Sequence, residues 1–325
     1  MSLHVLVTGA AGYIGSVLVR QLLEQGYSVT GFDNLMFGGQ SLVGLFNHPR
    51  FRFLRGDLRS PSDVAGALKS VEAVVHLAAI VGDPACKAMP DDARAINFEG
   101  SCALHDRAIA TTSVRRFVFA STCSNYGRME ANAILNEESP LAPLSIYAET
   151  KVAVEQRLLA ADSPAELATT VLRFSTVYGV SPRMRFDLTV NEFVREVVLG
   201  KELVIFGEQF WRPYCHVEDL ARSCVCVLRA DTGAVKGQVF GVGDTRENYQ
   251  KQMIAAEILK QISSARIRYV NQDIDPRDYR VDFSKIRNAL GFAITKTVPN
   301  GIAEIRNLLL SGLLTDPYAA VYRNT

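Results

Sequence analysis

Tyr147 and Lys151 are a pair of residues whose types and spacing could do chemistry. Residues four apart share one face of a helix, so the two side chains would lie next to one another. A tyrosine hydroxyl has an ordinary pKa of about 10 and is a poor base at neutral pH. A lysine ammonium one turn away would stabilise the phenolate and lower that pKa, so that Tyr147 could take a proton from an alcohol. The alternative is an amphipathic helix in which the pair has no such role.

A glycine-rich segment near the N-terminus could hold a phosphate. It runs from Thr8 to Gly15, follows an expected strand and opens an expected helix. Glycines there let the backbone turn tightly and let a pyrophosphate approach the first N–H groups of the helix, where the dipole favours negative charge. The segment therefore predicts dinucleotide binding, although its spacing is G-x-x-G-x-x-G and not the G-x-G-x-x-G of dehydrogenases. Glycines that serve only as turns are the alternative.

Acidic residues at the ends of the next strands bear on which dinucleotide would bind. Asp33 ends the second expected strand, where its carboxylate could accept both ribose hydroxyls of an adenosine and would repel a 2′-phosphate. NAD is therefore predicted in preference to NADP. Asp57 follows the third expected strand and could bond the adenine amine. For both residues a helix cap or a turn is the alternative.

The elements that must position these residues alternate along the first half of the chain. Short apolar runs predict strands at Val5–Thr8, Ser28–Phe32, Phe51–Leu54, Ala73–His76, Arg116–Ala120 and Thr170–Phe174. Amphipathic stretches predict helices at Tyr13–Gln25, Ser62–Ser70, Ala93–Ala110 and Tyr147–Ala161. Apolar strands that alternate with helices indicate βαβ units. The predicted fold class is α/β, with a Rossmann-type doubly wound parallel sheet.

After about residue 180 the pattern becomes irregular. Helices are expected at Asp187–Leu199, Val217–Ala230, Tyr249–Gln261 and Val298–Ser311, with short strands and Arg/Asp-rich turns between them. We therefore expect a NAD-binding domain over residues 1–180 and a smaller, mixed C-terminal substrate lobe over residues 181–325. Parts of residues 215–245 are expected to return to the first sheet.

Composition and charge exclude several classes of protein. The chain has 325 residues, 35 Lys and Arg against 34 Asp and Glu, and 48% hydrophobic residues. The balance of charge gives no support for electrostatic capture of nucleic acid or of an anionic membrane. The hydrophobic content excludes wholesale disorder. No apolar run reaches the roughly 18 residues of a membrane span, and no signal-type segment opens the chain. The six cysteines are scattered, so we expect reduced thiols in a cytoplasmic protein and no metal site.

Taken in order, the motifs resemble those of the extended short-chain dehydrogenases/reductases, the group of nucleotide-sugar epimerases and dehydratases. The resemblance covers essentially the whole chain. The combination of motifs in this order is far more specific than any one motif. The matching segments are Gly9-x-x-Gly12-x-x-Gly15, Asp33-Asn34-Leu35, Gly56-Asp57-Leu58, His76-Leu77-Ala78-Ala79, Asn97-x-x-Gly100, Ser121 to Gly127, Tyr147-x-x-x-Lys151, Arg173 to Gly179, and Arg212 to Asp219.

The resemblance implies a NAD-dependent enzyme that acts on a nucleotide-diphosphate sugar. Its catalytic residues would be Tyr147, Lys151 and Thr122, the last of which would hydrogen-bond the reacting hydroxyl. The implied cofactor contacts are Gly9, Gly12, Tyr13, Ile14, Gly15, Asp33, Asn34, Asp57, Leu58, Leu77, Ala78, Ala79, Asn97, Ser121, Tyr147 and Lys151. The implied substrate contacts are Thr122, Cys123, Ser124, Thr176, Asn191, Arg212 and Arg277.

The two positions after Thr122 bear on the type of reaction. Related 4,6-dehydratases carry Asp and then Glu there, to remove water as an acid and base pair, and decarboxylating relatives usually keep an acid nearby. Here the positions hold Cys123 and Ser124, and a serine hydroxyl cannot replace the carboxylate base. This argues against dehydration and decarboxylation and favours a 4-epimerase that works through a 4-keto intermediate.

A net C4 dehydrogenase shares the first half-reaction and stays as the alternative. Three segments are similar to a subgroup that includes nucleotide-heptose 4-dehydrogenases: Asp33–Phe37, Ser181–Arg185 and Asp275–Tyr279. A NAD-sensing protein without catalysis and an NADPH reductase of small carbonyls are more distant rivals.

Cationic residues would clamp the substrate diphosphate, because Arg binds phosphate bidentately. Arg212 and Arg277 match family positions that hold it, and Asn191 resembles an Asn that bonds it; solvated surface residues are the alternative. For Arg183 and Arg185 the sequence leaves both readings open. A homodimer is expected through the helices near 93–110 and 147–161.

Overall fold

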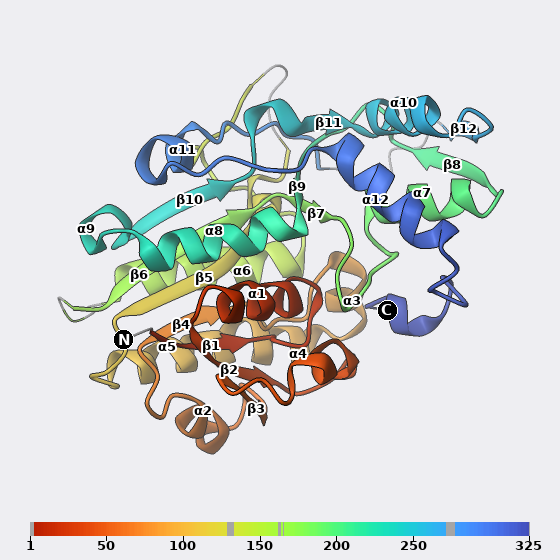
Figure 1. Cartoon of the computed structure of the whole chain (residues 1–325). Coiled ribbons are helices and arrows are strands. Elements are labelled where there is room, and N and C mark those ends of the chain that lie inside the picture. Colours follow the sequence, from red (N-terminus) through yellow and green to blue (C-terminus); the bar gives the residue numbers. More distant parts are fainter. Residues whose placement is uncertain (1–2, 129–132, 162–163, 165, 271–276, 325) are drawn as a thin grey trace.

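Seven parallel strands form the central sheet of this computed structural model, which describes residues 3–128, 133–161, 164, 166–270 and 277–324. The order across the sheet is β10-β6-β5-β4-β1-β2-β3 (Figure 1). The strands are β1 (His4–Thr8), β2 (Ser28–Asp33), β3 (Phe51–Arg55), β4 (Ala73–His76), β5 (Arg116–Thr122), β6 (Ala168–Phe174) and β10 (Gln238–Val242). The predicted α/β fold with a Rossmann-type doubly wound sheet is confirmed.

Both faces of this sheet are buried, which explains why its strands are continuous apolar runs. Successive side chains of a strand point to opposite faces, so Val5 and Val7 pack on one side and Leu6 packs on the other. The first side is covered by α1 (Tyr13–Glu24) and α8 (Val217–Arg229), which lie against each other. The second side is covered by α2 (Pro61–Ala67), α5 (Ser101–Ile109) and α6 (Ile146–Ala160).

The order of the strands creates a crevice at the carboxyl ends of the strands of the sheet. The chain moves outward from β1 through β2 to β3 and then returns to the other side of β1 as β4. In open parallel sheets, ligands bind at the carboxyl ends of the strands where the direction of winding reverses. The Gly9–Gly15 segment follows β1, Asp33 ends β2, and Thr122 ends β5, so the predicted site residues converge on this edge.

The C-terminal lobe has its own apolar core and two small sheets. One sheet joins β7 (Thr176–Tyr178), β9 (Trp211–His216) and β11 (Asn248–Gln250), and the other pairs β8 (Glu202–Phe206) with β12 (Arg266–Val270). The helices that surround these strands are α7 (Thr189–Val198), α10 (Lys251–Gln261) and α12 (Val298–Leu310). Apolar side chains three and four residues apart, such as Ile302, Ile305 and Leu309 of α12, build this core.

Shorter elements complete the described chain. They are α3 (Asp83–Ala88), α4 (Pro90–Arg94), a π-helical stretch at Ala95–Gly100, α9 (Thr232–Val235), α11 (Ser284–Leu290), and 3-10 turns at Gln40–Leu45, Cys123–Tyr126, Thr245–Glu247 and Ala320–Tyr322. The single helix expected at 93–110 is therefore three segments, α4, the π-helical stretch and α5. Beyond residue 215, α8 packs on α1, and β10 pairs with β6.

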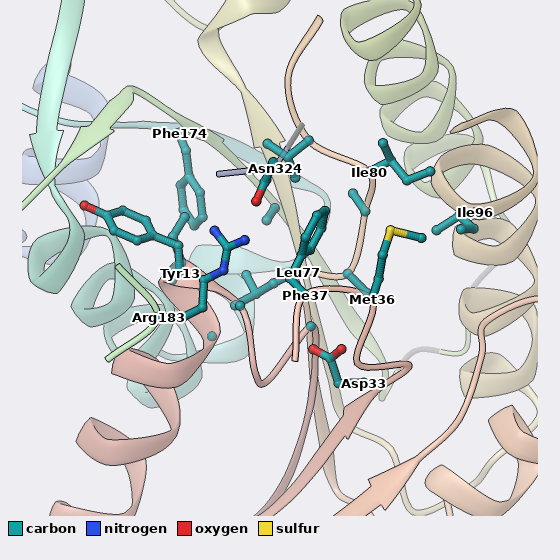
Figure 2. A pocket seen from close by; sticks show the side chains of 18 of the residues that line it. Tyr13, Asp33, Met36, Phe37, Leu77, Ile80, Ile96, Phe174, Arg183 and Asn324 are labelled. Carbon is teal, nitrogen blue, oxygen red and sulfur yellow. The ribbon is translucent and has the colours of Figure 1, made fainter. Parts of the chain in front are cut away.

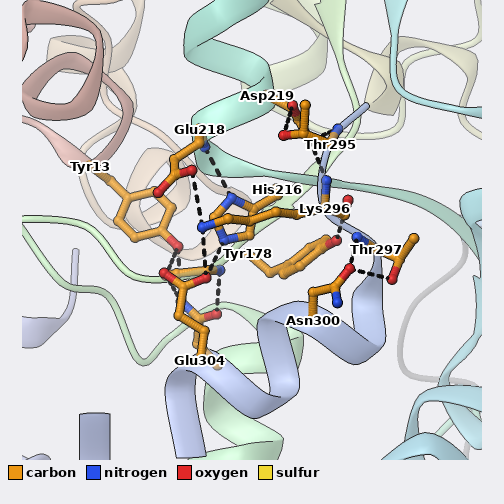
Figure 3. Close-up of polar contacts among 12 residues, drawn as sticks. Tyr13, Tyr178, His216, Glu218, Asp219, Thr295, Lys296, Thr297, Asn300 and Glu304 are labelled. Atoms are coloured by element: carbon orange, nitrogen blue, oxygen red, sulfur yellow. Dashed lines mark hydrogen bonds and ion pairs between the residues drawn. The ribbon is translucent and has the colours of Figure 1, made fainter. Parts of the chain in front are cut away.

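Polar contacts around His216 join the C-terminal lobe to α8 (Figure 3). The His216 imidazole is buried and lies 2.8 Å from a Glu304 carboxylate oxygen, and Lys296 lies 3.3 Å from the same oxygen. Asp219 accepts bonds from the backbone N–H groups of Thr295 and Lys296. His216 thus has a packing role, because its ring nitrogens bond Glu304 and the Glu218 backbone N–H.

Within the described residues, no helix is both long enough and apolar enough to cross a membrane. The same part of the chain holds no group of three or more His, Cys, Asp or Glu side chains placed to bind a metal ion.

Candidate active site

The Gly9–Gly15 turn fits a pyrophosphate because its first and last glycines have no room for a side chain. Gly9 has φ +71°, and a Cβ there would lie 2.8 Å from the Ala78 nitrogen. A Cβ on Gly15 would lie 2.0 Å from the Gly9 carbonyl oxygen, so no side chain could be added without moving backbone. The turn leads into α1, whose first N–H groups have no partner within the helix. Gly9, Gly12, Tyr13, Ile14 and Gly15 all line one pocket.

Asp33 faces this pocket and also supports the glycine turn. One carboxylate oxygen accepts a bond from the Ala11 N–H at 3.0 Å, and the other accepts from the Leu35 N–H at 2.8 Å. Burial raises the pKa of Asp33, and the two backbone bonds act against that rise. Asn34, Asp57 and Leu58 line the pocket beside it. The hydrogen bond from the Arg59 guanidinium lowers the pKa of Asp57 to about 2, so this carboxylate carries its charge at neutral pH.

A buried chain of hydrogen bonds supports the loop after β4 on the side that faces away from the pocket. Thr8 Oγ1 lies 2.7 Å from His76 Nδ1, and His76 Nε2 lies 2.8 Å from Ser101 Oγ. Burial lowers the pKa of His76 to about 3, so the ring is neutral and its role is structural. Leu77, Ala78 and Ala79 line the pocket above this chain.

Asn97 lies behind the pocket wall. It is fully buried, its Oδ1 accepts from the Ile80 N–H at 2.8 Å, and its Nδ2 donates to the Ile80 carbonyl at 2.9 Å. Asn97 therefore positions the loop whose residues face the pocket, and its predicted cofactor contact stays a prediction.

Thr122, Tyr147 and Lys151 meet at the end of β5. All three residues line the pocket, and the Thr122 hydroxyl acts to lower the pKa of Tyr147. Helix α6 begins directly before Tyr147, because the Ser145 hydroxyl accepts a bond from the Ala148 N–H and caps the first turn. The ammonium of Lys151 donates to the Ala120 carbonyl at 2.8 Å and lies 4.7 Å from the centre of the Phe119 ring.

The electrostatics of Tyr147 differ from the expectation. The sequence predicts that Lys151 and the positive ring of bound oxidised NAD together lower the phenol pKa. Among the protein's own groups, burial raises that pKa, and the nearby Cys86 and Asp83 raise it further. Groups that act in the lowering direction are the Thr122 hydroxyl and Arg185. Burial also lowers the pKa of Lys151 to about 8. Burial is thus the main cause of the raised phenol pKa, and the Lys151 ammonium bonds the Ala120 carbonyl.

No carboxylate follows Thr122. Cys123 is buried, its thiol donates to the Arg173 carbonyl at 3.3 Å, and burial raises its pKa well above the ordinary value. Ser124 is half-buried, and its backbone N–H donates to Thr122 Oγ1 at 3.1 Å. Ser121 lines the pocket and donates a hydrogen bond to Glu155. The end of β5 therefore presents hydroxyl groups to the pocket.

The residues predicted to bind substrate from the C-terminal lobe lie outside this pocket lining. Asn191 is fully buried, and its amide bonds Gly179 N–H, the Arg185 carbonyl and the Tyr13 hydroxyl. Thr176 is half-buried at the start of β7. Their contacts with substrate stay predictions.

The two predicted arginine clamps, Arg212 and Arg277, also lie outside this lining. Arg212 is buried, with its guanidinium 5.0 Å from the centre of the Tyr279 ring. Arg277 Nη1 lies 3.1 Å from an Asp83 oxygen, and the other Asp83 oxygen accepts from the Ser145 hydroxyl at 2.7 Å. Arg277 is thereby placed near the start of α6. Asp275 and Pro276, which precede it in the segment singled out above, lie outside the described residues.

Several residues that the sequence did not assign also line the pocket (Figure 2). Arg183 and Arg185, left open by the sequence, enter from the segment after β7, and Phe37 follows β2. Asn324 comes from the far end of the described chain. Two arginines within three residues were a usable signal for phosphate binding, whereas nothing near Asn324 in the sequence marks it.

Comparison with known proteins places these motifs in one family. The model of the NAD dependent epimerase/dehydratase family matches residues 5–243. A dTDP-glucose 4,6-dehydratase of Streptomyces griseus is 31% identical over 318 residues, which is 93% of each chain. A protein of Bacillus subtilis (strain 168) named as an uncharacterized UDP-glucose epimerase is 32% identical over 234 residues, 70% of this chain and 72% of its own.

A solved structure has the same fold and a similar sequence. The UDP-glucuronic acid 4-epimerase of Bacillus cereus, in complex with UDP-glucuronic acid and NAD, superposes with a TM-score of 0.84 at 26% identity. The match covers 95% of this chain and 99% of that one. The relatives thus include both epimerases and dehydratases, and similarity by itself does not choose between the two reactions.

Proposed function

This chain belongs to the NAD dependent epimerase/dehydratase family, and on that premise we propose that it is a 4-epimerase of a nucleotide-diphosphate sugar. One observation carries the proposal. Thr122, Tyr147 and Lys151 line the same pocket as the glycine turn, and the two positions that follow Thr122 are a buried, hydrogen-bonded thiol and a serine. This set can move a proton at one carbon, and it lacks the acid and base pair that removal of water requires.

NAD is the cofactor of the family, and the residues of this pocket fit it. The glycine turn of residues 9–15 would hold the pyrophosphate, and the Asp33 carboxylate would hold the adenosine ribose. Bound in its oxidised form, NAD supplies an acceptor that takes a hydride from a sugar carbon and can return it, together with a positive ring charge.

Tyr147 is the proposed proton carrier. In its phenolate form Tyr147 accepts the proton of the C4 hydroxyl while C4 is oxidised to a ketone, and Thr122, which lines the same pocket, donates a hydrogen bond to the reacting oxygen. The buried Lys151 ammonium supplies positive charge one helical turn away. After the keto sugar has rotated in the pocket, Tyr147 returns the proton to the C4 oxygen as reduction occurs from the other face. The net change is inversion at C4, with no atom gained or lost.

Dehydration would need groups that this site does not offer at the matching positions. Elimination of water across C5 and C6 requires a base for the C5 proton and an acid for the leaving hydroxyl. The Cys123 thiol points to the Arg173 carbonyl, and its raised pKa makes it a poor acid. The Ser124 hydroxyl is too weak a base at neutral pH.

Product analysis on a panel of nucleotide sugars tests the proposal. Mass spectrometry and NMR should show an isomer of unchanged mass that is inverted at C4. Loss of two hydrogens would identify the alternative, a net C4 dehydrogenase, and loss of water would identify a dehydratase. Turnover that depends on NADPH and ignores nucleotide sugars, or no turnover at all, would contradict the proposal as a whole.

We also propose a homodimer in a reducing, cytoplasmic compartment. The six cysteines are free thiols in the structure, as expected in a reducing compartment.

The proposed dimer interface is the outer face of α5 and α6. It carries Ala103, Leu159 and an ion pair between Arg157 and Asp106. Sedimentation should give twice the chain mass, and Ala103→Glu should give the monomer by placing a charge in the contact. A monomer in the unmodified protein would contradict this interface.

A further inference from the structure

The segment of residues 318–324, here called the strap, lies against the dinucleotide pocket although it is distant from it in sequence. Its residue Asn324 is 8% exposed and lines the pocket together with the glycine turn. Figure 2 shows the Asn324 side chain over the space between Tyr13, Phe37 and Arg183. The strap is therefore part of the pocket wall and not only a surface segment.

The strap is attached to the C-terminal lobe at several points along its length. The Tyr318 hydroxyl donates to Glu196 at 3.1 Å, and its ring lies beneath Arg195 and Lys201, at 4.4 Å and 3.7 Å from the two cations. The Phe186 N–H donates to the Tyr322 carbonyl at 2.9 Å, and the two rings meet edge to face with their centres 5.8 Å apart. These contacts fix the end of the strap over the pocket.

Arg183 connects the strap to the pocket. Its Nη2 donates to the Arg323 carbonyl at 2.8 Å, and its guanidinium stacks 4.9 Å from the centre of the Phe37 ring. Among the described residues, no group bonds its buried Nε and Nη1, and none bonds the buried Oδ1 of Asn324. Buried polar atoms without partners are costly, so a built site with three of them indicates a ligand that satisfies them.

The chemistry of these atoms selects the ligand. The Nε and Nη1 N–H groups of one guanidinium point in different directions, so they can bond oxygens of two neighbouring phosphates, and a diphosphate offers the required negative charge. The Phe37 ring on which Arg183 lies follows Asp33 along the chain, which favours the diphosphate of the dinucleotide over that of the sugar nucleotide. The Asn324 amide oxygen can accept from a ribose hydroxyl of the same molecule.

We propose that Arg183 and Asn324 are dinucleotide-binding residues, and that the strap is the device that holds them on the dinucleotide. Arg183 binds the diphosphate that the glycine turn also holds, and the Arg323 carbonyl orients its guanidinium. Tyr318 is a positioning residue, because it anchors the strap through contacts that do not involve the ligand. The inference rests on the NAD pocket and not on the proposed sugar chemistry, so the two can fail independently.

Titration calorimetry on the full chain, freed of nucleotide, measures the two ligands separately. For Arg183→Met and Asn324→Ala we expect the Kd for NAD to rise by roughly ten- to a hundredfold and by roughly three- to tenfold, respectively. The Kd for UDP should stay unchanged. Arg268→Ala is the matched control, because it removes an exposed arginine whose ion pair with Glu202 lies on β8 and β12. Circular dichroism confirms that each variant is folded.

Stopped-flow release of NADH tests the strap. Tyr318→Ala should speed release by roughly tenfold, whereas Tyr318→Phe, which keeps the ring beneath Arg195 and Lys201, should stay within about threefold of the unmodified protein. Unchanged NAD affinity in both Arg183→Met and Asn324→Ala would overturn the proposal. Weakened UDP binding with normal NAD binding would overturn it too, since the diphosphate would then belong to the sugar nucleotide. Equal release rates in the two Tyr318 variants would refute the anchoring role.

Discussion

At Tyr147, burial raises the phenol pKa, whereas the proposed proton transfer is favoured by a lower one. The Tyr147 side chain is partly buried and its pKa is raised, so at neutral pH it holds its proton unless positive charge arrives nearby. The Thr122 hydroxyl at the end of β5 acts against the rise. A protonated phenol cannot take the proton of a substrate hydroxyl, so the proposed role requires the phenolate, which the positive ring charge of bound oxidised NAD would favour.

Removal of the Tyr147 hydroxyl should therefore abolish turnover without loss of cofactor. For Tyr147→Phe we expect kcat to fall by roughly a hundred- to ten-thousandfold, the usual range for a lost general acid–base group. The Kd for NAD should change little. Tyr269→Phe, on an exposed ring of β12, is the control. Turnover within about tenfold of the unmodified enzyme would show that another residue carries the proton.

Asp33 should set the choice of cofactor. Asp33→Ser removes a charged acceptor from the ribose and also removes the support of the Ala11 and Leu35 N–H groups. We expect the Kd for NAD to rise by roughly tenfold or more and the preference over NADP to narrow, because the repulsion of a 2′-phosphate is gone. Titration with both dinucleotides measures this ratio, and an unchanged ratio would place the adenosine ribose elsewhere.

Residue types and spacing predicted the part of the pocket wall that belongs to local motifs. The glycine turn, Asp33, Thr122 and Tyr147 each follow a strand or open a helix, so their positions follow from the order of the elements. Asn324 could not be found in this way, because tertiary packing alone brings residue 324 to the turn at residue 9. The direction of the Lys151 ammonium was also beyond a spacing argument, since it depends on the neighbouring Ala120 carbonyl.

At the scale of elements, a buried ion pair locks the strands and helix that carry the catalytic residues. Glu155 of α6 accepts from Arg173 of β6 at 2.9 Å, from Asn125 at 2.7 Å, and from Ser121 at the end of β5. The side chains of Glu155 and Arg173 are only 2% and 6% exposed. The ion pair joins α6 to β6, and the Ser121 hydrogen bond joins α6 to the end of β5, which together fix Tyr147 relative to Thr122.

Loss of one partner of this pair should destabilise the fold strongly. For Glu155→Ala we expect the free energy of unfolding to fall by about 3–5 kcal/mol, because the Arg173 charge is left buried without its partner. Urea unfolding measures the change. The double variant Glu155→Gln with Arg173→Met should recover part of the loss. A loss below about 1 kcal/mol for Glu155→Ala would mean that the pair does not join these elements.

Apolar runs and amphipathic stretches predicted the strands and helices of the central sheet well, because both faces of that sheet are buried and the patterns are strong. They predicted less where tertiary contacts shape the backbone. The helix expected at 93–110 contains a π-helical stretch, and Asn97 within it bonds Ile80. Short elements such as α3 and α11 were too brief to show a period.

At the scale of the whole molecule, two buried histidines link stability to pH. Burial lowers the pKa of His76 to about 3 and that of His105 to about 4. The unfolded chain binds these protons near the ordinary histidine pKa, so below about pH 6.5 it holds more protons than the folded chain. Stability must then fall as pH drops from about 6.5 toward the folded pKa values, and it is fully present above about pH 7.

Urea unfolding at several pH values tests this linkage. Between about pH 6 and pH 5 the two groups should together lower the free energy of unfolding by roughly 2–3 kcal/mol. His105→Gln should remove about half of that slope, because the amide can still bond the Thr169 hydroxyl that His105 contacts at 2.9 Å. An unchanged slope in His105→Gln would mean that this ring takes up its proton in the folded state.

The most direct test of the proposed chemistry uses a nucleotide sugar labelled with deuterium at C4. If the Thr122, Tyr147 and Lys151 set only oxidises and reduces C4, the product keeps its mass and its deuterium at C4 with inverted configuration. The Tyr147→Phe variant forms this product at a rate lower by roughly a hundredfold or more. Deuterium at C6 together with loss of water, or a product that carries a ketone at C4 and has lost the label, would contradict the account.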